Sequence, residues 1–179
     1  MEKALSSQVR FAGKVLKLRV DEVEVAEGRR AVREVVEYPG AVTVLPLTEY
    51  GEVLMVRQYR YPVGEELLEL PAGKLEAGED PLETAKRELA EETGYRAREM
   101  RLLLRFYTTP GFSTEEMHLF LATGLTPGEP DPDPDEFITV EKVPLERARE
   151  MVAQGQIRDA KSIVGLLAAG SVTSAGARA

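Results

Sequence analysis

Three glutamates that lie close together in the sequence, Glu88, Glu91 and Glu92, have a spacing suited to binding a divalent cation. Side chains at i, i+3 and i+4 are neighbours on one face of an α-helix, where each pair of like charges costs roughly 0.2–0.5 kcal/mol. Arg87 can offset part of this repulsion. A bound cation could offset the rest, because carboxylate oxygens are preferred ligands of Mg²⁺ and Mn²⁺. The alternative is an acidic helix face that is simply solvated.

The helix that must carry these glutamates has clear ends in the sequence. Asp80 is a good N-cap, Pro81 suits the first helical position, and Glu83 stands where a capping-box partner belongs. Gly94 can end the helix in the left-handed conformation. The sequence therefore predicts a helix over about residues 81–93. Its apolar stripe consists of Leu82, Ala85 and Leu89.

The first part of the chain has the pattern of β structure. Within residues 8–38, imperfect alternation of apolar and polar residues predicts a strand at 15–25, a turn at 26–29 and a returning strand at 31–38. Two strands alone are marginally stable, so we expect the hairpin to pack on the following domain or on a second subunit. We assign residues 1–39 to a small N-terminal antiparallel β subdomain.

The rest of the chain is predicted to form a second domain over 40–170. Its expected strands are 41–47, 53–60, 67–73, 100–108, 117–122 and 137–143, and its later helices are 145–153 and 158–169. The apolar face of the last helix would consist of Ile163, Leu166 and Leu167. Residues 123–133 are rich in proline, glycine and aspartate, which predicts a mobile loop. The small and polar residues 171–179 predict a disordered tail.

Composition narrows the possible functions. The net charge of −8 over 179 residues argues against binding nucleic acid or anionic membranes through bulk charge. There are no cysteines, which excludes disulfides and thiolate metal sites. The N-terminus lacks the apolar core of a signal peptide, and no apolar run approaches the ~20 residues that span a membrane. We therefore expect a cytoplasmic protein.

The glutamate helix and the loop before it match a known sequence signature. The pattern is Gly, five residues, Glu, seven residues, then Arg-Glu-apolar-any-Glu-Glu-any-Gly-apolar. The chain supplies Gly73, Glu79, Arg87, Glu88, Leu89, Glu91, Glu92, Gly94 and Tyr95 without a departure. Over roughly 40–170 the chain therefore resembles the Nudix hydrolases. This resemblance implies an α/β (α+β) fold, in which a mixed β-sheet lies between helices.

Within that family, the chain is most similar to the ADP-ribose pyrophosphatases. The run from Glu69 to Gly73 leads into the signature as it does there, and Pro110 falls sixteen residues beyond Gly94. The N-terminal strand pair resembles the extra domain with which those enzymes form homodimers. The resemblance implies Mg²⁺- or Mn²⁺-dependent hydrolysis of ADP-ribose to AMP and ribose 5-phosphate. The alternatives are a pyrophosphatase for another nucleotide sugar or dinucleotide, and a non-catalytic regulator that binds ADP-ribose.

The same resemblance implies roles for individual residues. Glu88 and Glu92 would be the main metal ligands, joined by the Ala72 backbone carbonyl, and Glu91 would assist or bind through water. Glu79 and Arg87 would brace the loop against the helix. The expected substrate contacts are Arg57, Arg60, Pro110 and, across a dimer, Arg33. Glu69 would either face the substrate or form a salt bridge with a neighbouring arginine.

The general base is the least defined part of the implied site. Relatives often carry an alternating Asp/Glu run before the last strand, and Glu136 aligns best with a glutamate of that run. Asp135 and Asp133 are the next candidates. Pro134 stands where another acidic residue is common, which is a departure from the family pattern.

Overall fold

The computed structural model describes residues 1–76, 78–131 and 137–176, and its chain forms two compact units. The first unit contains Met1–Gly40 together with Phe106–Glu116. The second contains Ala41–Arg105 and the residues from Met117 onward. The first boundary between the two units, between Gly40 and Ala41, lies close to the predicted boundary at 39. The assignment of the second segment to the first unit is a feature that the sequence did not suggest.

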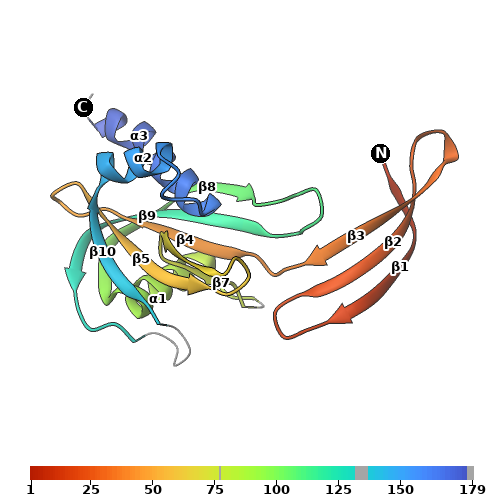
Figure 1. Cartoon of the computed structure of the whole chain (residues 1–179), viewed down its shortest axis with the longest axis horizontal. Coiled ribbons are helices and arrows are strands. Elements are labelled where there is room, and N and C mark those ends of the chain that lie inside the picture. Colours follow the sequence, from red (N-terminus) through yellow and green to blue (C-terminus); the bar gives the residue numbers. More distant parts are fainter. Residues whose placement is uncertain (77, 132–136, 177–179) are drawn as a thin grey trace. The chain divides into compact units, whose positions relative to one another are not determined.

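The first unit contains a three-stranded antiparallel sheet in the order β1-β2-β3 (Figure 1). Its strands are β1 (Lys3–Ala12), β2 (Lys17–Glu24) and β3 (Arg30–Glu37), and a 3₁₀ turn, η1 (Ala26–Gly28), joins the last two. The predicted strand pair is therefore incomplete, because a third strand precedes it. The segment Lys3–Gln8 has no clear apolar alternation, which is why sequence pattern missed the start of β1.

The loop that contains Phe112 and Thr114 forms hydrogen bonds with β3 and with the residue that follows it. The Val36 N–H donates to the Phe112 carbonyl at 2.7 Å, and the Thr114 N–H donates to the Val36 carbonyl at 3.0 Å. The Tyr38 N–H donates to the Thr114 hydroxyl at 2.9 Å. These hydrogen bonds explain why Phe106–Glu116 belongs to the first unit.

The second unit is built on two sheets, with strand orders β7-β4-β9-β8 and β10-β5-β6. Their strands are β4 (Ala41–Pro46), β5 (Glu52–Arg60), β6 (Glu65–Glu69), β7 (Ala72–Lys74), β8 (Tyr95–Tyr107), β9 (Glu116–Pro127) and β10 (Thr139–Pro144). Strand β4 runs parallel to β9 and antiparallel to β7, so the predicted mixed sheet is confirmed.

Three strand predictions need correction. The strand predicted at 100–108 begins earlier, since β8 starts at Tyr95. The predicted strand 67–73 is divided into β6 and β7, which lie in different sheets. Pro71, at the division, has no N–H to donate to a strand ladder. Strand β9 continues to Pro127, so the loop predicted from Thr123 begins later than expected.

In the part of the second unit that the structure describes, the sheets are covered by α1 (Pro81–Thr93), α2 (Leu145–Ala153) and α3 (Ala160–Gly176). In Figure 1, α1 lies on one side of the sheets, and α2 and α3 lie on the other. The first two helices have the predicted bounds, but α3 runs to Gly176, where a disordered tail was expected from 171. Leu167 is 58% exposed, so it does not belong to the buried face of α3. Within the described ranges, none of the helices combines the length and apolar character that a bilayer span requires.

Strand β4 forms the centre of the second unit, and all six of its residues are buried. Because successive side chains of a strand point to opposite faces, β4 presents different residues to α1 and to α3. Val42 and Val44 belong to the cluster that contains Ala85 and Leu89 of α1. On α3, a Cβ at Gly165 would lie 2.4 Å from Leu70, so this helix packs closely through a residue without a side chain.

We predict that Gly94→Ala destabilises the chain more than Gly51→Ala, although both glycines have φ of +75°. A left-handed conformation costs an alanine about 1–2 kcal/mol at either site. At Gly94 the new Cβ would also lie 2.8 Å from the Gly128 carbonyl oxygen and from the Pro130 nitrogen, whereas at Gly51 it meets no described atom within 4 Å. Urea unfolding of both variants measures the difference. Equal losses of unfolding free energy would contradict a steric role for Gly94.

Candidate active site

Helix α1 begins and ends as its sequence predicts. The Asp80 carboxylate accepts a hydrogen bond from the Leu82 N–H at 2.8 Å, and Gly94 ends the helix with φ of 75°. The capping box is not formed by Glu83, whose carboxylate is 2.7 Å from the Lys86 ammonium. Glu92 is only 3% exposed, so this glutamate lies on the buried side of the helix, facing the sheet.

Two glutamates of α1 meet the backbone of strand β7 at adjacent residues. The Glu92 carboxylate accepts a hydrogen bond from the Ala72 N–H at 3.0 Å. The Glu88 carboxylate lies against Gly73, where a Cβ would be 1.9 Å from its Cδ and Oε1 atoms. The position can hold a glycine and the Glu88 carboxylate together, but not a larger residue without displacing that carboxylate. The helix spacing and this close approach therefore bring two carboxylates to one stretch of backbone.

Arg87 balances the charge of the glutamates around it. Its guanidinium lies 2.9 Å from the Glu88 carboxylate, 2.7 Å from Glu91 and 3.5 Å from Glu79. Burial acts to lower the pKa of Arg87, but the carboxylates of Glu88 and Glu91 outweigh it and raise that pKa. The contact between Glu79 and Arg87 joins the loop to the helix, which confirms the predicted brace.

The donor set suits a hard divalent cation. Among the described residues, no group of three or more His, Cys, Asp or Glu side chains is gathered for metal binding. Mg²⁺ does not require such a cage, because it is commonly held by one or two carboxylates, its own waters and substrate phosphates. Glu88 and Glu92 supply two carboxylates beside the Ala72–Gly73 backbone. The residues present therefore fit a magnesium ion shared with a phosphate-bearing ligand.

Two of the three arginines predicted to bind substrate lie near the end of β5, and both form ion pairs. The Nε of Arg57 is 2.5 Å from the Glu141 carboxylate on β10. Arg60 donates two hydrogen bonds to Glu69, at 2.8 and 2.7 Å. The hydrogen bond that each arginine donates to its carboxylate partner raises the pKa of that arginine, so both remain cationic. Their side chains are 37% and 39% exposed, so each is partly accessible.

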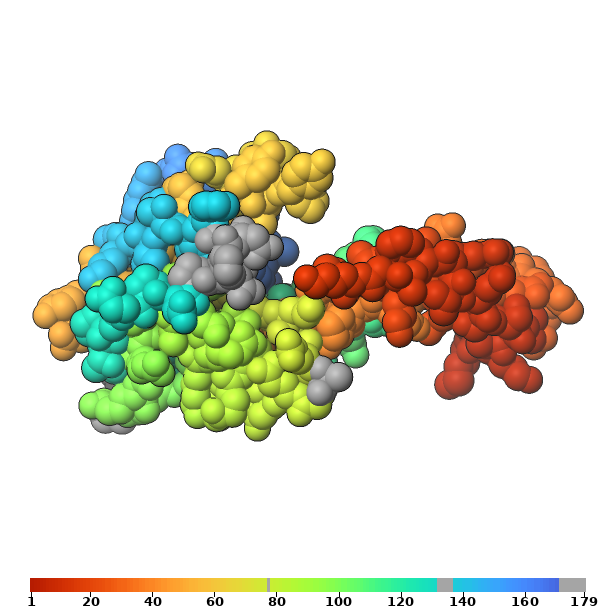
Figure 2. All heavy atoms as spheres, turned by 90° about the horizontal axis from the view of Figure 1, so that it is seen from below, coloured from red at the N-terminus to blue at the C-terminus, as the bar shows by residue number. Residues whose placement is uncertain are grey.

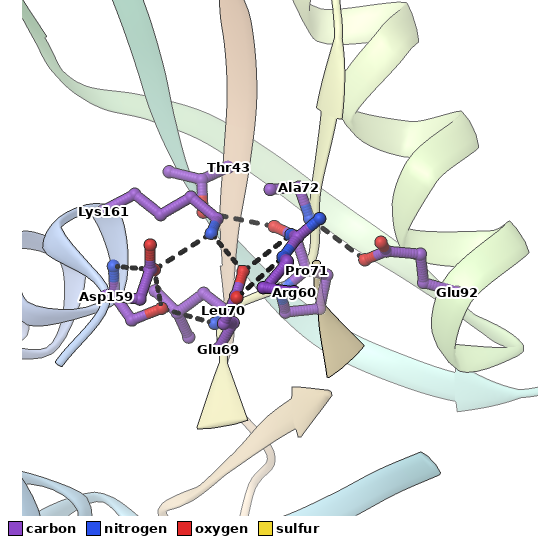
Figure 3. A network of polar contacts seen from close by, with 10 residues as sticks. Thr43, Arg60, Glu69, Leu70, Pro71, Ala72, Glu92, Asp159 and Lys161 are labelled. Carbon is purple, nitrogen blue, oxygen red and sulfur yellow. Dashed lines mark hydrogen bonds and ion pairs between the residues drawn. The ribbon is translucent and has the colours of Figure 1, made fainter. Parts of the chain in front are cut away.

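Glu69 is the centre of a buried polar network (Figure 3). Its side chain is 1% exposed and is bound by both Arg60 and Lys161. Burial acts to raise the pKa of Glu69, but these two cations outweigh it and hold the pKa below its ordinary value of 4.5. Of the two roles considered for Glu69, the salt bridge is confirmed, and direct contact with substrate stays a prediction.

Three residues at the start of α3 complete this network, and sequence analysis missed them. Lys161 is also 3.0 Å from Asp159, whose carboxylate accepts hydrogen bonds from the N–H and hydroxyl of Ser162. The Ser162 hydroxyl in turn accepts from the Leu70 N–H at 2.7 Å. The available signal was a lysine in the first turn of an otherwise apolar helix, since a lysine on a buried face needs an acidic partner.

The remaining predicted residues belong elsewhere or are not described. Arg33 lies on β3 of the first unit, where its guanidinium contacts Glu2 at 3.0 and 2.5 Å. Pro110 is exposed in the loop of the same unit. Glu136, Asp135 and Asp133, the candidates for the general base, lie outside the described residues.

Comparisons with known proteins agree with the fold. The model of the NUDIX domain matches residues 37–164. The chain is 45% identical over 163 residues to the ADP-ribose pyrophosphatase of Bacillus subtilis, covering 90% of this chain and 88% of that one. It is 43% identical over 165 residues to a methanol dehydrogenase activator of Bacillus methanolicus, covering 91% and 89%. This chain belongs to the Nudix family.

A solved structure shows the same fold at lower sequence identity. The crystal structure of an ADP compounds hydrolase superposes with a TM-score of 0.88 at 21% identity. The match covers 99% of this chain and 97% of the other. The three-stranded N-terminal sheet and the Nudix domain are therefore both parts of an architecture already seen.

The Lys161–Glu69 pair predicts how stability depends on pH. Because the folded pKa of Glu69 is depressed, its contribution is complete above the ordinary value of 4.5 and is lost as pH falls through the folded pKa. Lys161→Met should therefore cost about 1.5–3 kcal/mol near neutral pH, and this gap should narrow in acid. Urea unfolding of wild type and variant across that range measures the gap. A gap that stays constant with pH would show that the pair does not carry the loss.

Proposed function

We propose that this chain hydrolyses the diphosphate linkage of ADP-ribose to AMP and ribose 5-phosphate, with Mg²⁺, or Mn²⁺ in its place, as cofactor. The observation that carries the proposal is the meeting of the Glu88 and Glu92 carboxylates at the Ala72–Gly73 backbone. The name of the Bacillus subtilis relative supports the choice of substrate. Hydrolysis of another nucleotide sugar or dinucleotide, and binding of ADP-ribose without turnover, are the rival functions.

The glutamates of α1 would hold the metal and the loop would complete its site. Glu88, Glu92 and the Ala72 carbonyl would be the ligands, and Glu91 would assist or bind through water. When bound, Mg²⁺ neutralises charge on the phosphoryl oxygens and lowers the pKa of a coordinated water. Arg87 holds Glu91 and Glu88 in position, since its guanidinium contacts both.

Hydrolysis requires a proton acceptor and a way to stabilise the leaving phosphate. In the reaction, water oxygen forms a bond to one phosphorus, and the bond from that phosphorus to the bridging oxygen breaks. Glu136 would accept the proton of the attacking water, with Asp135 and Asp133 as the other candidates. The cationic side chains of Arg57 and Arg60 would bind the diphosphate, because guanidinium groups pair well with phosphate oxygens. Pro110 and Glu69 would complete the substrate contacts.

The test is turnover of ADP-ribose with Mg²⁺ and then with excess EDTA, beside GDP-mannose, other nucleotide sugars and NADH. We expect rapid release of AMP from ADP-ribose, its loss with EDTA and its recovery when Mg²⁺ is returned. Turnover of another panel member in preference would keep the mechanism and change the substrate. Tight binding of ADP-ribose without turnover would favour the regulatory rival.

Glu92→Gln is the matched inactive variant for this assay. Glutamine can still accept the hydrogen bond from the Ala72 N–H, so the fold should persist, but it loses the charge that a metal ligand needs. We expect kcat to fall by about 10²-fold or more while the unfolding transition changes little. Turnover close to wild type would overturn the assignment of Glu92.

We also propose a homodimer, formed through the N-terminal sheet. All ten residues of β1 are exposed, including Val9 and Phe11, and Figure 2 shows the strand, in red, at the surface of the first unit. A small sheet with so few buried apolar residues gains stability by covering such a face. The dimer would bring Arg33 of one subunit to the site of the other.

A cytoplasmic location stays a prediction from the sequence.

Sedimentation velocity tests the dimer. We expect wild type to sediment as a dimer and Phe11→Glu to raise the dimer Kd by at least about tenfold, because it places a charge on the apolar face. Leu102→Glu, at a 47% exposed position in the second unit, is the control and should leave the dimer unchanged. A monomeric wild type would refute the proposal.

A further inference from the structure

The four residues that lead into the signature, Glu69 to Ala72, are each held by a different group. Arg60 and Lys161 bind the Glu69 carboxylate, and the Ser162 hydroxyl accepts from the Leu70 N–H. The Pro71 carbonyl accepts from the Val44 N–H at 2.9 Å and from the Thr43 hydroxyl at 3.1 Å. The Ala72 N–H donates to Glu92. Apart from the contact of Val44, Figure 3 shows these contacts along the segment from Glu69 to Ala72.

The start of α3 supplies the contact at Leu70 through two linked hydrogen bonds. Ser162 is fully buried, and its hydroxyl donates to the Asp159 carboxylate at 2.6 Å while it accepts from Leu70. The Ser162 N–H donates to the same carboxylate at 3.0 Å. Because Asp159 fixes the direction of the hydroxyl proton, the oxygen lone pair faces the Leu70 N–H. The hydroxyl thus has a defined orientation at a fully buried position.

Lys161 ties this hydrogen-bond chain to the charged half of the network. Its ammonium bridges the carboxylates of Asp159 and Glu69, and Glu69 holds Arg60 by two hydrogen bonds. Two cations and two carboxylates therefore balance in the buried cluster. Removing one member leaves a buried charge or polar group without its partner, which is costly.

The segment from Glu69 to Ala72 ends beside the carboxylates of Glu92 and Glu88, which the proposed reaction needs. Ala72 lies two residues beyond Leu70, and its N–H fixes the Glu92 carboxylate. Its neighbour Gly73 lies against the carboxylate of Glu88. The backbone between Leu70 and Gly73 is short and includes a proline, so a shift at one end is transmitted to the other.

We propose that Ser162, oriented by Asp159 and supported by Lys161, is a positioning residue for the metal site on the opposite side of strand β4. This inference rests on the proposed function, since it concerns the same Glu92 and Ala72. The alternative is that the cluster only attaches α3 to the sheet. That alternative predicts a loss of stability without a change in metal affinity.

The experiment measures Mn²⁺ affinity directly, through the electron paramagnetic resonance signal of the free ion, in the absence of turnover. We expect Ser162→Ala to raise the Mn²⁺ Kd by about tenfold, a size typical of changes behind the metal ligands. Thr48→Val is the matched control, because it also removes a hydroxyl that accepts from a backbone N–H, that of Glu52 at 3.1 Å. It should leave the Mn²⁺ Kd unchanged.

A second variant protects the test against loss of folding. Asp159→Asn keeps an oxygen acceptor for Ser162 but weakens the pair with Lys161, and we expect it to raise the Mn²⁺ Kd by a smaller factor. Thermal unfolding of each variant reports whether the fold is retained. A folded Ser162→Ala variant with wild-type Mn²⁺ affinity would overturn the inference.

The outcome is separable from that of the proposed function. If wild type hydrolyses ADP-ribose with Mg²⁺ while Ser162→Ala binds Mn²⁺ as tightly as wild type, only the positioning role fails. If wild type neither binds Mn²⁺ nor shows metal-dependent turnover on any panel member, the proposed function fails and the inference fails with it.

Discussion

The close approach of helix α1 to strand β7 is the constraint on which the candidate site depends. For a helix that carries several glutamates to pack on a sheet, the sheet must offer hydrogen-bond donors to the carboxylates or space for them. Here the Ala72 N–H meets Glu92, and the missing side chain of Gly73 leaves room for Glu88. The apolar side chains of the same helix, Ala85 and Leu89, supply the packing that holds the contact together. Apolar burial and carboxylate placement are therefore parts of one interface.

The second unit contains two groups of charged side chains, and they differ in the balance between cations and carboxylates. Around Arg87, three carboxylates share one guanidinium, which leaves excess negative charge that a divalent cation can neutralise. Around Glu69, cations and carboxylates balance in number, and the burial of the cluster makes its geometry stiff. The unbalanced set is suited to binding, and the balanced set is suited to support. Their connection through Leu70 and Ala72 links the two sets in one backbone segment.

Local sequence signals predicted the bounds of α1 and α2 well. The N-cap at Asp80 and the glycine at Gly94 fix α1 by local rules alone, and both are confirmed. Predictions were weaker where partners distant in sequence decide the outcome. Strand β9 continues to Pro127 because β8 pairs with it, although the residues there resemble a loop. Lys161 and Ser162 were missed because their partners, Glu69 and Leu70, are far away in the sequence, and no periodic pattern signals such a contact.

The order in which the chain leaves the ribosome has a consequence for the first unit. Its three strands lie before Gly40, but the hydrogen bonds of Val36 and Tyr38 require Phe112 and Thr114, which are synthesised much later. Domains generally fold as units during synthesis, beginning at the N-terminus. The first unit cannot complete its fold in this order, because Ala41–Arg105 of the second unit is synthesised before Phe112 and Thr114. A nascent chain that stops after β3 therefore presents an unfinished sheet edge, and such edges pair readily with other strands.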